Sequence, residues 1–358
     1  MKPLSGLRIL EFDGLGPVTF AGMMLADLGA DVLRLSRGAE AAVFSEVGGE
    51  VLHRGRAAVG VNLKDPDDKQ GVLALIEGAD ALIEGFRPGV MERLGLGPDA
   101  CARLNARLVY GRITGWGQTG PMARQVGHDI NYIALSGALH AMGEPDRPPR
   151  PPLNLVGDYG GGAMMLVTGV LAALLEARTT GRGRVVDAAM TDGSALLMSL
   201  FQALGARGLW SEGRGANLLD GGAPFYRCYA CRDGRFLAVG ALEPQFYAAL
   251  VAGLGLEPES APQFDLAGWP DLHARLEAVF ATRDRDDWAA RFEGTDACVT
   301  PVLTMAEAAR HPHNAARRTF VEQAVTQAAP TPRFDGTPAE PAAQSAPMSL
   351  DDARDRWR

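Results

Sequence analysis

The sequence predicts an α/β protein with two domains: a large one built on a parallel sheet with crossover helices, and a smaller α+β one. Its 358 residues fit about two domains of ordinary size. The apolar run Leu7–Phe12 precedes a glycine loop, a helical stretch and a second apolar run at Asp31–Leu35. This strand–loop–helix–strand order is typical of parallel sheets. Later, Phe225–Cys231 and Phe236–Ala241 flank an Asp-Gly turn, which predicts a hairpin.

The other elements of the large domain follow from apolar runs and their stop signals. Pro17 suits the first turn of a helix that ends near Leu28, and Gly29 follows it. We expect further strands within Arg54–Lys64 and at Ala81–Glu84, Leu108–Ile113 and Arg184–Asp187. We expect helices at Pro66–Glu77, near Arg93, from Gly127 to about Met142, from Asp158 to about Glu176, and at Asp192–Gly205.

The smaller domain continues after the hairpin with a helix that starts at Glu243-Pro244. Gly208–Gly222 is rich in glycine without periodicity, which favours a linker. After about Pro330 the chain is rich in Pro, Ala and Thr, and we expect it to be loosely structured. The remaining predicted elements are helices at Trp269–Phe280, Asp286–Phe292 and Leu350–Arg358 and a strand at Ala297–Val302.

Composition excludes several classes of protein. A net charge of −8 argues against general nucleic-acid binding. We expect no membrane span, because no apolar run approaches about 18–20 uncharged residues. The N-terminus predicts no signal peptide, and Asp-Arg-Trp-Arg at the C-terminus is not a sorting signal. Four scattered cysteines favour a reducing cytoplasm, and Cys228-x-x-Cys231 lacks the second pair that a zinc site needs, so we expect no metal.

The first glycine loop is only a partial dinucleotide fingerprint. It has Gly14-x-Gly16, but Thr19 stands where a third glycine belongs. After the second strand, Arg37 replaces the acidic residue that holds a ribose hydroxyl. Arg37 suits a phosphorylated ribose, as in NADP or in the 3′-phosphate of coenzyme A. A solvated arginine explains it equally well.

Basic residues recur at or near strand ends in this otherwise acidic chain. Ligands of parallel sheets bind outside the carboxyl ends of the strands, and arginine side chains suit phosphate oxygens. Any one of these residues has an ordinary explanation as a solvated charge, and only the set favours a phosphate-rich ligand. The set is Arg37, Arg56, Lys64, Arg87 and Arg93.

Two ionisable residues, His128 and Asp158, each stand where a helix is expected to begin. Two proton-transferring groups delivered in this way suggest acid/base chemistry on a carbon next to a carbonyl. The structural alternatives are a packed histidine and an N-cap aspartate. Three glycines follow Asp158 at Gly160–Gly162, and glycine weakens a helix. Either a ligand approaches this backbone or another helix packs closely on it.

Several longer motifs together identify a resemblance that covers nearly the whole chain. They are Pro3–Arg8, Asp27–Val32, Glu84–Val90, Gly115–Pro121, Gly127–Tyr132, Asn154–Asp158, Gly221–Pro224 and Gly240–Tyr247. With these residues the chain resembles the racemases of the family III CoA transferase superfamily. The resemblance implies an interlocked homodimer in which each subunit has a large Rossmann-like domain that binds CoA and a small domain that closes the partner's site.

The implied domain division places the large domain at residues 1–190, completed by about 325–358. A linker at 191–221 leads to the small domain at 222–305, and a return linker covers 306–324. The implied activity is the interconversion of (R)- and (S)-2-methylacyl-CoA in fatty acid metabolism, through an enolate. CoA belongs to the substrate, and no cofactor is expected.

The resemblance also implies roles for individual residues. His128 and Asp158 would transfer the protons, and Glu243, from the other subunit's small domain, would hydrogen-bond the histidine. Contacts with CoA would fall on Arg37, Val61, Lys64, Arg87, Arg93 and Asp129.

Three other functions compete with racemisation. A CoA transferase would use Asp158 as a nucleophile that forms an acyl anhydride, but transferases of this superfamily generally lack a histidine at position 128. A non-catalytic acyl-CoA-binding protein would need neither His128 nor Glu243. An NADP oxidoreductase fits least, given Thr19.

Overall fold

The computed structural model describes residues 2–37, 48–257 and 261–358. The chain divides into two compact units. One unit contains Met1–Ala138, Pro152–Ser199 and His311–Arg358, and the other contains Leu139–Pro151 and Leu200–Arg310. Residues 139–151 therefore group with the second unit, although the predicted division puts them in the large domain. The predicted linkers at 191–221 and 306–324 stay predictions.

In the part of the first unit that the structure describes, six strands form one parallel sheet in the order β3-β2-β1-β4-β5-β6. This order is that of a Rossmann-like fold, and the predicted α/β class is confirmed. The strands are β1 (Arg8–Phe12), β2 (Asp31–Ser36), β3 (Arg56–Gly60), β4 (Ala81–Glu84), β5 (Val109–Thr114) and β6 (Val185–Ala189).

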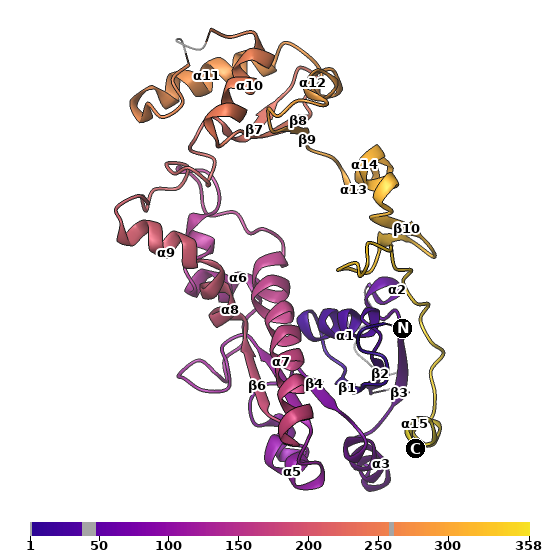
Figure 1. Ribbon diagram of the computed structural model, residues 1–358. Coiled ribbons are helices and arrows are strands. Elements are labelled where there is room, and N and C mark those ends of the chain that lie inside the picture. The colour runs from indigo at the N-terminus through magenta and orange to yellow at the C-terminus, as the bar shows by residue number, and fades with distance from the viewer. Residues whose placement is uncertain (1, 38–47, 258–260) are drawn as a thin grey trace. The chain divides into compact units, whose positions relative to one another are not determined.

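Helices cover both faces of this sheet (Figure 1). Alternate residues of a strand point to opposite faces, so Ile9 packs with α1 (Pro17–Asp27) and α7 (Met164–Thr180), while Leu10 packs with α3 (Pro66–Glu77) and α5 (Pro98–Leu104). The further helices of this unit are α2 (Gly49–Leu52), α4 (Val90–Arg93), α6 (Asp129–Leu135), α8 (Met190–Leu197), α14 (Pro312–Arg317) and α15 (Leu350–Trp357).

The C-terminal segment returns to the first unit. It carries a hairpin that the sequence did not predict, β10 (Phe320–Glu322) with β11 (Thr326–Ala328). Further on, the Met348 N–H donates to the carbonyl of Ala58 in β3. The Trp357 indole donates to the carboxylate of Asp31, the first residue of β2. This segment thus covers the edge strand of the sheet.

Two predicted helices near the glycine-rich motifs have different bounds. The helix expected to reach Met142 ends at Leu135, because Gly137 adopts a φ of 86° and only the short 3₁₀ turn η3 (Leu139–Ala141) follows. The helix expected to start at Asp158 starts earlier, as the π-helix η4 (Leu155–Ala163) that leads into α7. The expected Asp192–Gly205 helix is split into α8 and α9 (Ser199–Ala206).

The second unit contains a small antiparallel sheet, as the hairpin pattern predicts. β7 (Tyr226–Ala230) pairs with β8 (Phe236–Gly240), which pairs with β9 (Val299–Pro301). Its core is rich in aromatic side chains, with Phe225 and Trp288 among the buried ones. The helices are α10 (Pro244–Leu254), η6 (Leu266–Gly268), α11 (Trp269–Phe280), α12 (Arg285–Phe292) and α13 (Met305–Arg310).

One helical stretch in the described residues, Leu155–Thr180, is long and apolar enough to cross a membrane by length and composition alone. The expectation that no stretch approaches this length was therefore wrong. Half of its most apolar window is buried inside the protein, against β5 and β6 among other elements. A core helix of a folded domain passes the same test, so this is weak evidence for a membrane span.

Candidate active site

Several of the predicted site residues follow the carboxyl ends of the parallel strands. Between β1 and β4 the chain order of the strands reverses, and such a switch point is where ligands of these folds bind. The loop after β1 contains Gly16, the N-cap of α1, and Thr19 donates its hydroxyl to the Gly14 carbonyl at 2.6 Å. Thr19 thus closes the loop itself.

Exposed cations follow the strands at this edge. Arg37 comes directly after β2, Lys64 follows β3, and Arg87 follows β4. The Arg87 charge acts on Tyr132 of α6: burial raises the pKa of the Tyr132 hydroxyl, and Arg87 opposes that rise. Arg87 is therefore within electrostatic reach of the helix that His128 opens.

Two of the residues proposed from sequence, Arg56 and Val61, are buried rather than exposed. Arg56 starts β3, so it lies at the amino end of that strand, and it is fully buried in a salt bridge with Glu11. The inclusion of Arg56 among the ligand-facing cations was wrong. Val61 is buried in the core between the sheet and α3, and its N–H donates to the Ser36 carbonyl at 2.8 Å.

Two ion pairs of the buried Arg112 tie α4, which ends at the exposed Arg93, to the sheet edge. Arg112 on β5 donates to Glu84 at the end of β4 (2.7 Å) and to Glu92 on α4 (2.7 Å). Glu84 also accepts the Phe86 N–H at 2.7 Å. These contacts therefore hold the first residues of the loop that carries Arg87 in place at the end of β4.

His128 is the N-cap of α6, as predicted, and its side chain is exposed. Its N–H donates to the Asn131 side-chain oxygen at 3.0 Å. The Tyr132 hydroxyl donates to the Gly127 carbonyl, and the Tyr132 ring fills the space where side chains at Gly115 and Gly127 would stand. The backbone before His128 is thus fixed, and the residue itself is exposed.

Asp158 lies in the first turns of the π-helix η4, where its carboxyl group is half-buried. Asn154 donates its side-chain N–H to Asp158 Oδ2 at 3.2 Å. Burial raises the pKa of Asp158; the Asn154 hydrogen bond and the charge of His128 lower it, and the charge of Asp129 raises it. The net pKa lies above that of an ordinary aspartate, which suits a group that must hold a proton for half of a reaction cycle.

Neighbours lock the π-helix in place, which answers why glycines follow Asp158. Tyr159 stacks on Phe20 of α1, with ring centroids 4.2 Å apart. A β carbon at Gly161 would lie 2.6 Å from the Ser194 nitrogen of α8, and one at Gly162 would lie 2.8 Å from the Met190 side chain. At these two glycines, close helix packing is therefore the reason. π-Helical turns occur frequently at functional sites.

Asp129 joins the two predicted proton-transferring residues. It is the first residue of α6, it is buried, and its Oδ2 accepts the Asp158 N–H at 2.7 Å. This bond brings the start of α6, with His128, against the start of η4. Asn131, Asn154 and Gly157 were not predicted to have a role; their only signal in the sequence is their place within the matched motifs.

Glu243 belongs to the second unit, where it is the exposed N-cap of α10. Burial of Cys298 raises the pKa of its thiol, and the nearby charge of Glu243 raises that pKa further. The hydrogen bond from Glu243 to His128 stays a prediction. Among the described residues, no group of three or more His, Cys, Asp or Glu side chains is arranged to hold a metal ion.

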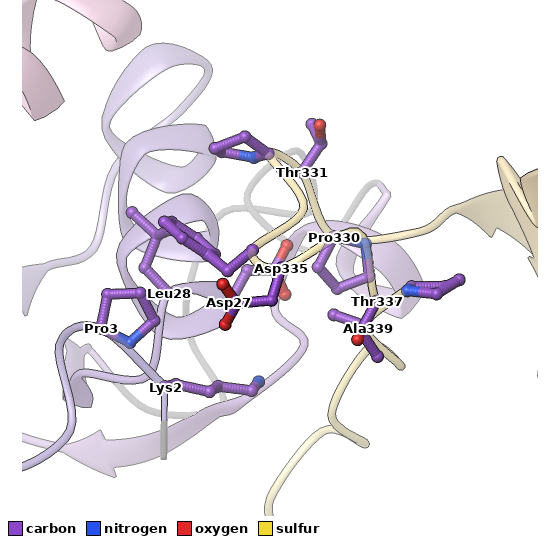
Figure 2. A pocket seen from close by; sticks show the side chains of 12 residues that line it. Lys2, Pro3, Asp27, Leu28, Pro330, Thr331, Asp335, Thr337 and Ala339 are labelled. Atoms are coloured by element: carbon purple, nitrogen blue, oxygen red, sulfur yellow. The ribbon is translucent and has the colours of Figure 1, made fainter.

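A cavity of about 450 Å³ lies away from these residues (Figure 2). Its lining includes Asp27 and Leu28 at the C-terminal end of α1, together with Pro330 and Asp335. The 11 residues of α1 separate it from the Gly16 end by about 16 Å at 1.5 Å per residue. None of the predicted site residues lines it, so the strand-end residues remain the candidate site.

The chain matches the model of CoA-transferase family III over residues 4–351. It is 44% identical over 347 residues to alpha-methylacyl-CoA racemase of Mus musculus, covering 96% of this chain and 90% of that protein. It is 43% identical over 348 residues to the Homo sapiens protein of the same name, with the same coverage. A solved CaiB/BaiF family protein from Brucella suis has the same fold, with a TM-score of 0.82, 24% identity and full coverage of both chains.

Proposed function

We propose that this chain, which belongs to CoA-transferase family III, is an alpha-methylacyl-CoA racemase that interconverts (R)- and (S)-2-methylacyl-CoA. The observation that carries the proposal is the junction of α6 and η4. There, His128 and Asp158 start from two segments joined by the hydrogen bond between Asp129 and the Asp158 N–H. The identity with the mouse and human racemases over nearly the whole chain supports the same function.

Racemisation requires two groups on opposite faces of the α carbon. In one direction the neutral His128 imidazole takes the α proton, the C–H electron pair moves into an enolate, and Asp158 delivers its proton to the other face. In the reverse direction ionised Asp158 is the base and the imidazolium is the acid. Each positioned acid or base typically contributes about 10²–10⁴-fold. A raised Asp158 pKa makes its protonated form accessible for the first direction.

The enolate oxygen needs stabilisation that acid/base transfer alone does not supply. Backbone N–H groups in the first turns of α6 and η4 would provide it, because they carry partial positive charge and need no reorganisation. The exposed cations Arg37, Lys64, Arg87 and Arg93 would bind the phosphates of CoA, and Val61 would contact it through its backbone. No cofactor is needed for this chemistry.

The proposal includes a homodimer in which Glu243 of the second unit hydrogen-bonds His128 of the partner subunit. A carboxylate there would raise the basicity of the imidazole and fix its orientation. The protein would act in the cytoplasm, in lipid metabolism. A cross-subunit site predicts that mixing Glu243→Ala and His128→Ala subunits restores activity, because each mixed dimer contains one intact site.

The alternative is a CoA transferase in which the Asp158 carboxylate attacks the thioester, releases CoA thiolate and forms an anhydride. The half-buried carboxyl group could serve as that nucleophile. Transfer, however, gives no role to the exposed imidazole that α6 presents beside Asp158.

Isotope exchange decides between the two reactions. One pure enantiomer of a 2-methylacyl-CoA, incubated in D₂O with no added carboxylate, should gain α-deuterium and lose optical purity. His128→Ala should lower exchange by about 10²–10⁴-fold while CoA affinity is unchanged, and exposed His313→Ala should have no effect. If exchange is absent and CoA passes to an added carboxylate, the racemase proposal is wrong.

A further inference from the structure

Asp129 makes a contact that a residue serving only the ligand would not need. Its Oδ2 accepts the N–H of Asp158, 29 positions along the chain, at 2.7 Å. The carboxyl group is buried, with 7% of the residue exposed. The peptide that fixes the start of the Asp158 side chain is therefore held from α6 by a charge-assisted hydrogen bond.

The backbone next to Asp158 is shaped to admit this carboxylate. A β carbon at Gly157 would lie 2.4 Å from Asp129 Oδ2 and 3.2 Å from the Ile133 side chain. Gly157 is buried and has no side chain to displace the bond. The pair Gly157 and Asp129 thus forms one fitted contact between α6 and η4.

The second oxygen of Asp129 shows that the contact is not optimised for stability. Oδ1 is buried and has no hydrogen-bond partner among the described residues. A buried polar atom without a partner destabilises a fold, and such atoms in native proteins call for a functional explanation. An uncharged side chain of the same shape would be tolerated at least as well if folding were the sole requirement.

We infer that Asp129 is a positioning residue for Asp158: its buried carboxylate accepts the Asp158 N–H and holds that peptide in place. This inference rests on the proposed racemase function. It differs from the contact with CoA expected at Asp129 from the sequence.

The groups that act on the Asp158 carboxyl come from a few neighbouring elements. From α6 these are His128, Asp129 and the phenol of Tyr132, and from its own turn Asn154. The loop before α1 contributes the uncharged Gly16. On α8, the positions of the following glycines face Met190, Ser194 and Leu197, which are uncharged.

The consequence for pH dependence follows from the sign of each charge. In the direction where Asp158 is the base, it must be ionised, so activity falls as pH drops through its pKa. A negative Asp129 beside it raises that pKa, whereas the positive charge of His128 lowers it. Removing the Asp129 charge should therefore move the acid limb of kcat/KM to lower pH.

Two substitutions separate the hydrogen bond from the charge. Asp129→Asn keeps a side-chain oxygen that can accept the Asp158 N–H and removes the charge. Asp129→Ala removes both. Asp99→Asn is the matched control, because Asp99 is an exposed acid in the first turn of α5, another seven-residue helix.

We expect Asp129→Asn to move the acid limb of kcat/KM to lower pH, with an unchanged or higher melting temperature and an unchanged Kd for free CoA. Asp129→Ala should lower kcat by on the order of 10²-fold, as expected for a misplaced catalytic group. It should also speed hydrogen–deuterium exchange at the Asp158 amide, whereas Asp129→Asn and Asp99→Asn should leave that amide protected.

Two results would overturn the inference. One is a weaker affinity for CoA in Asp129→Asn with kcat and the pH profile unchanged, which would make Asp129 a ligand contact. The other is unchanged exchange at the Asp158 amide in Asp129→Ala. Amide exchange does not depend on turnover, so a wild-type protein without α-proton exchange would refute the racemase function and still leave the anchoring of Asp158 measurable.

Discussion

Gly16 lies directly against the carboxyl group of Asp158: a β carbon at position 16 would be 3.1 Å from Asp158 Oδ2. Gly16 also has a φ of 69°, which other residues adopt only with strain. The loop after the first strand therefore packs directly on the proposed acid/base group. In a dinucleotide fold the same loop would approach a pyrophosphate.

Gly16→Ala should reduce racemisation, because the new methyl group crowds the Asp158 carboxyl. Misplacement of a catalytic group can lower turnover on the order of 10²-fold. Gly6→Ala is the control, since Gly6 also has a positive φ (88°) but nothing within 4 Å of the added carbon. Both variants should lose about 1 kcal/mol of stability. Equal activity of the two variants would contradict the crowding.

Asn154→Ala should raise the pKa of Asp158 further, because the Asn154 hydrogen bond favours the charged carboxylate. The acid limb of kcat/KM should then move to higher pH, in the opposite direction to Asp129→Asn. Profiles of kcat/KM against pH for Asn154→Ala, Asp129→Asn and the variant with both substitutions measure these shifts. An acid limb that does not move in Asn154→Ala would show that Asp158 does not set it.

Asp158→Asn should abolish exchange of the substrate's α proton and should stabilise the fold at neutral pH. Burial is the main cause of the raised Asp158 pKa, so the folded state holds the proton more tightly than the unfolded chain does. Stability from this group is present below the unfolded pKa, about 3.9, and is lost as pH rises through the folded pKa. The variant should therefore have a higher melting temperature than the wild type at pH 7, and the two melting temperatures should approach each other toward pH 4. A variant that melts earlier at pH 7 would contradict this sign.

Arg112→Met should destabilise the large unit by about 3–5 kcal/mol, because Glu84 would keep a buried charge without its partner. The Glu84→Gln/Arg112→Met double variant should recover part of that loss. Arg184→Met removes an exposed pair with Glu176 and should leave the free energy of unfolding almost unchanged, because water screens that pair. Urea denaturation measures all three. Similar losses for Arg112→Met and Arg184→Met would show that burial does not govern the Arg112 network.

Local signals identified most elements of the fold. Asp65 accepts the N–H groups of Asp67 and Asp68, Pro66 follows it, and Gly78 ends the helix, so α3 has the predicted bounds. His128 was placed correctly at the start of α6 for the same kind of reason. Short elements without such signals, such as the hairpin of β10 and β11, were missed because their pairing depends on the rest of the fold.

The sequence by itself determined the α/β class, the Rossmann-like order implied by the resemblance, the family, and two residues proposed to transfer protons. These depend on signals within a few residues of each other or on motifs that match as strings. Burial and long-range contact were decided only by the tertiary structure. Arg56, which resembled a ligand-facing cation, pairs with Glu11 inside the protein.

The same distinction applies to the candidate site. The sequence placed Asp158 at the start of a helix, and packing against α1, α6 and α8 places it inside a π-helix instead. Asp129 stands beside His128 in the sequence, yet its hydrogen bond is to Asp158, 29 residues away. Such a contact follows from how two helix starts meet over the sheet, and that meeting depends on the packed core rather than on any local pattern.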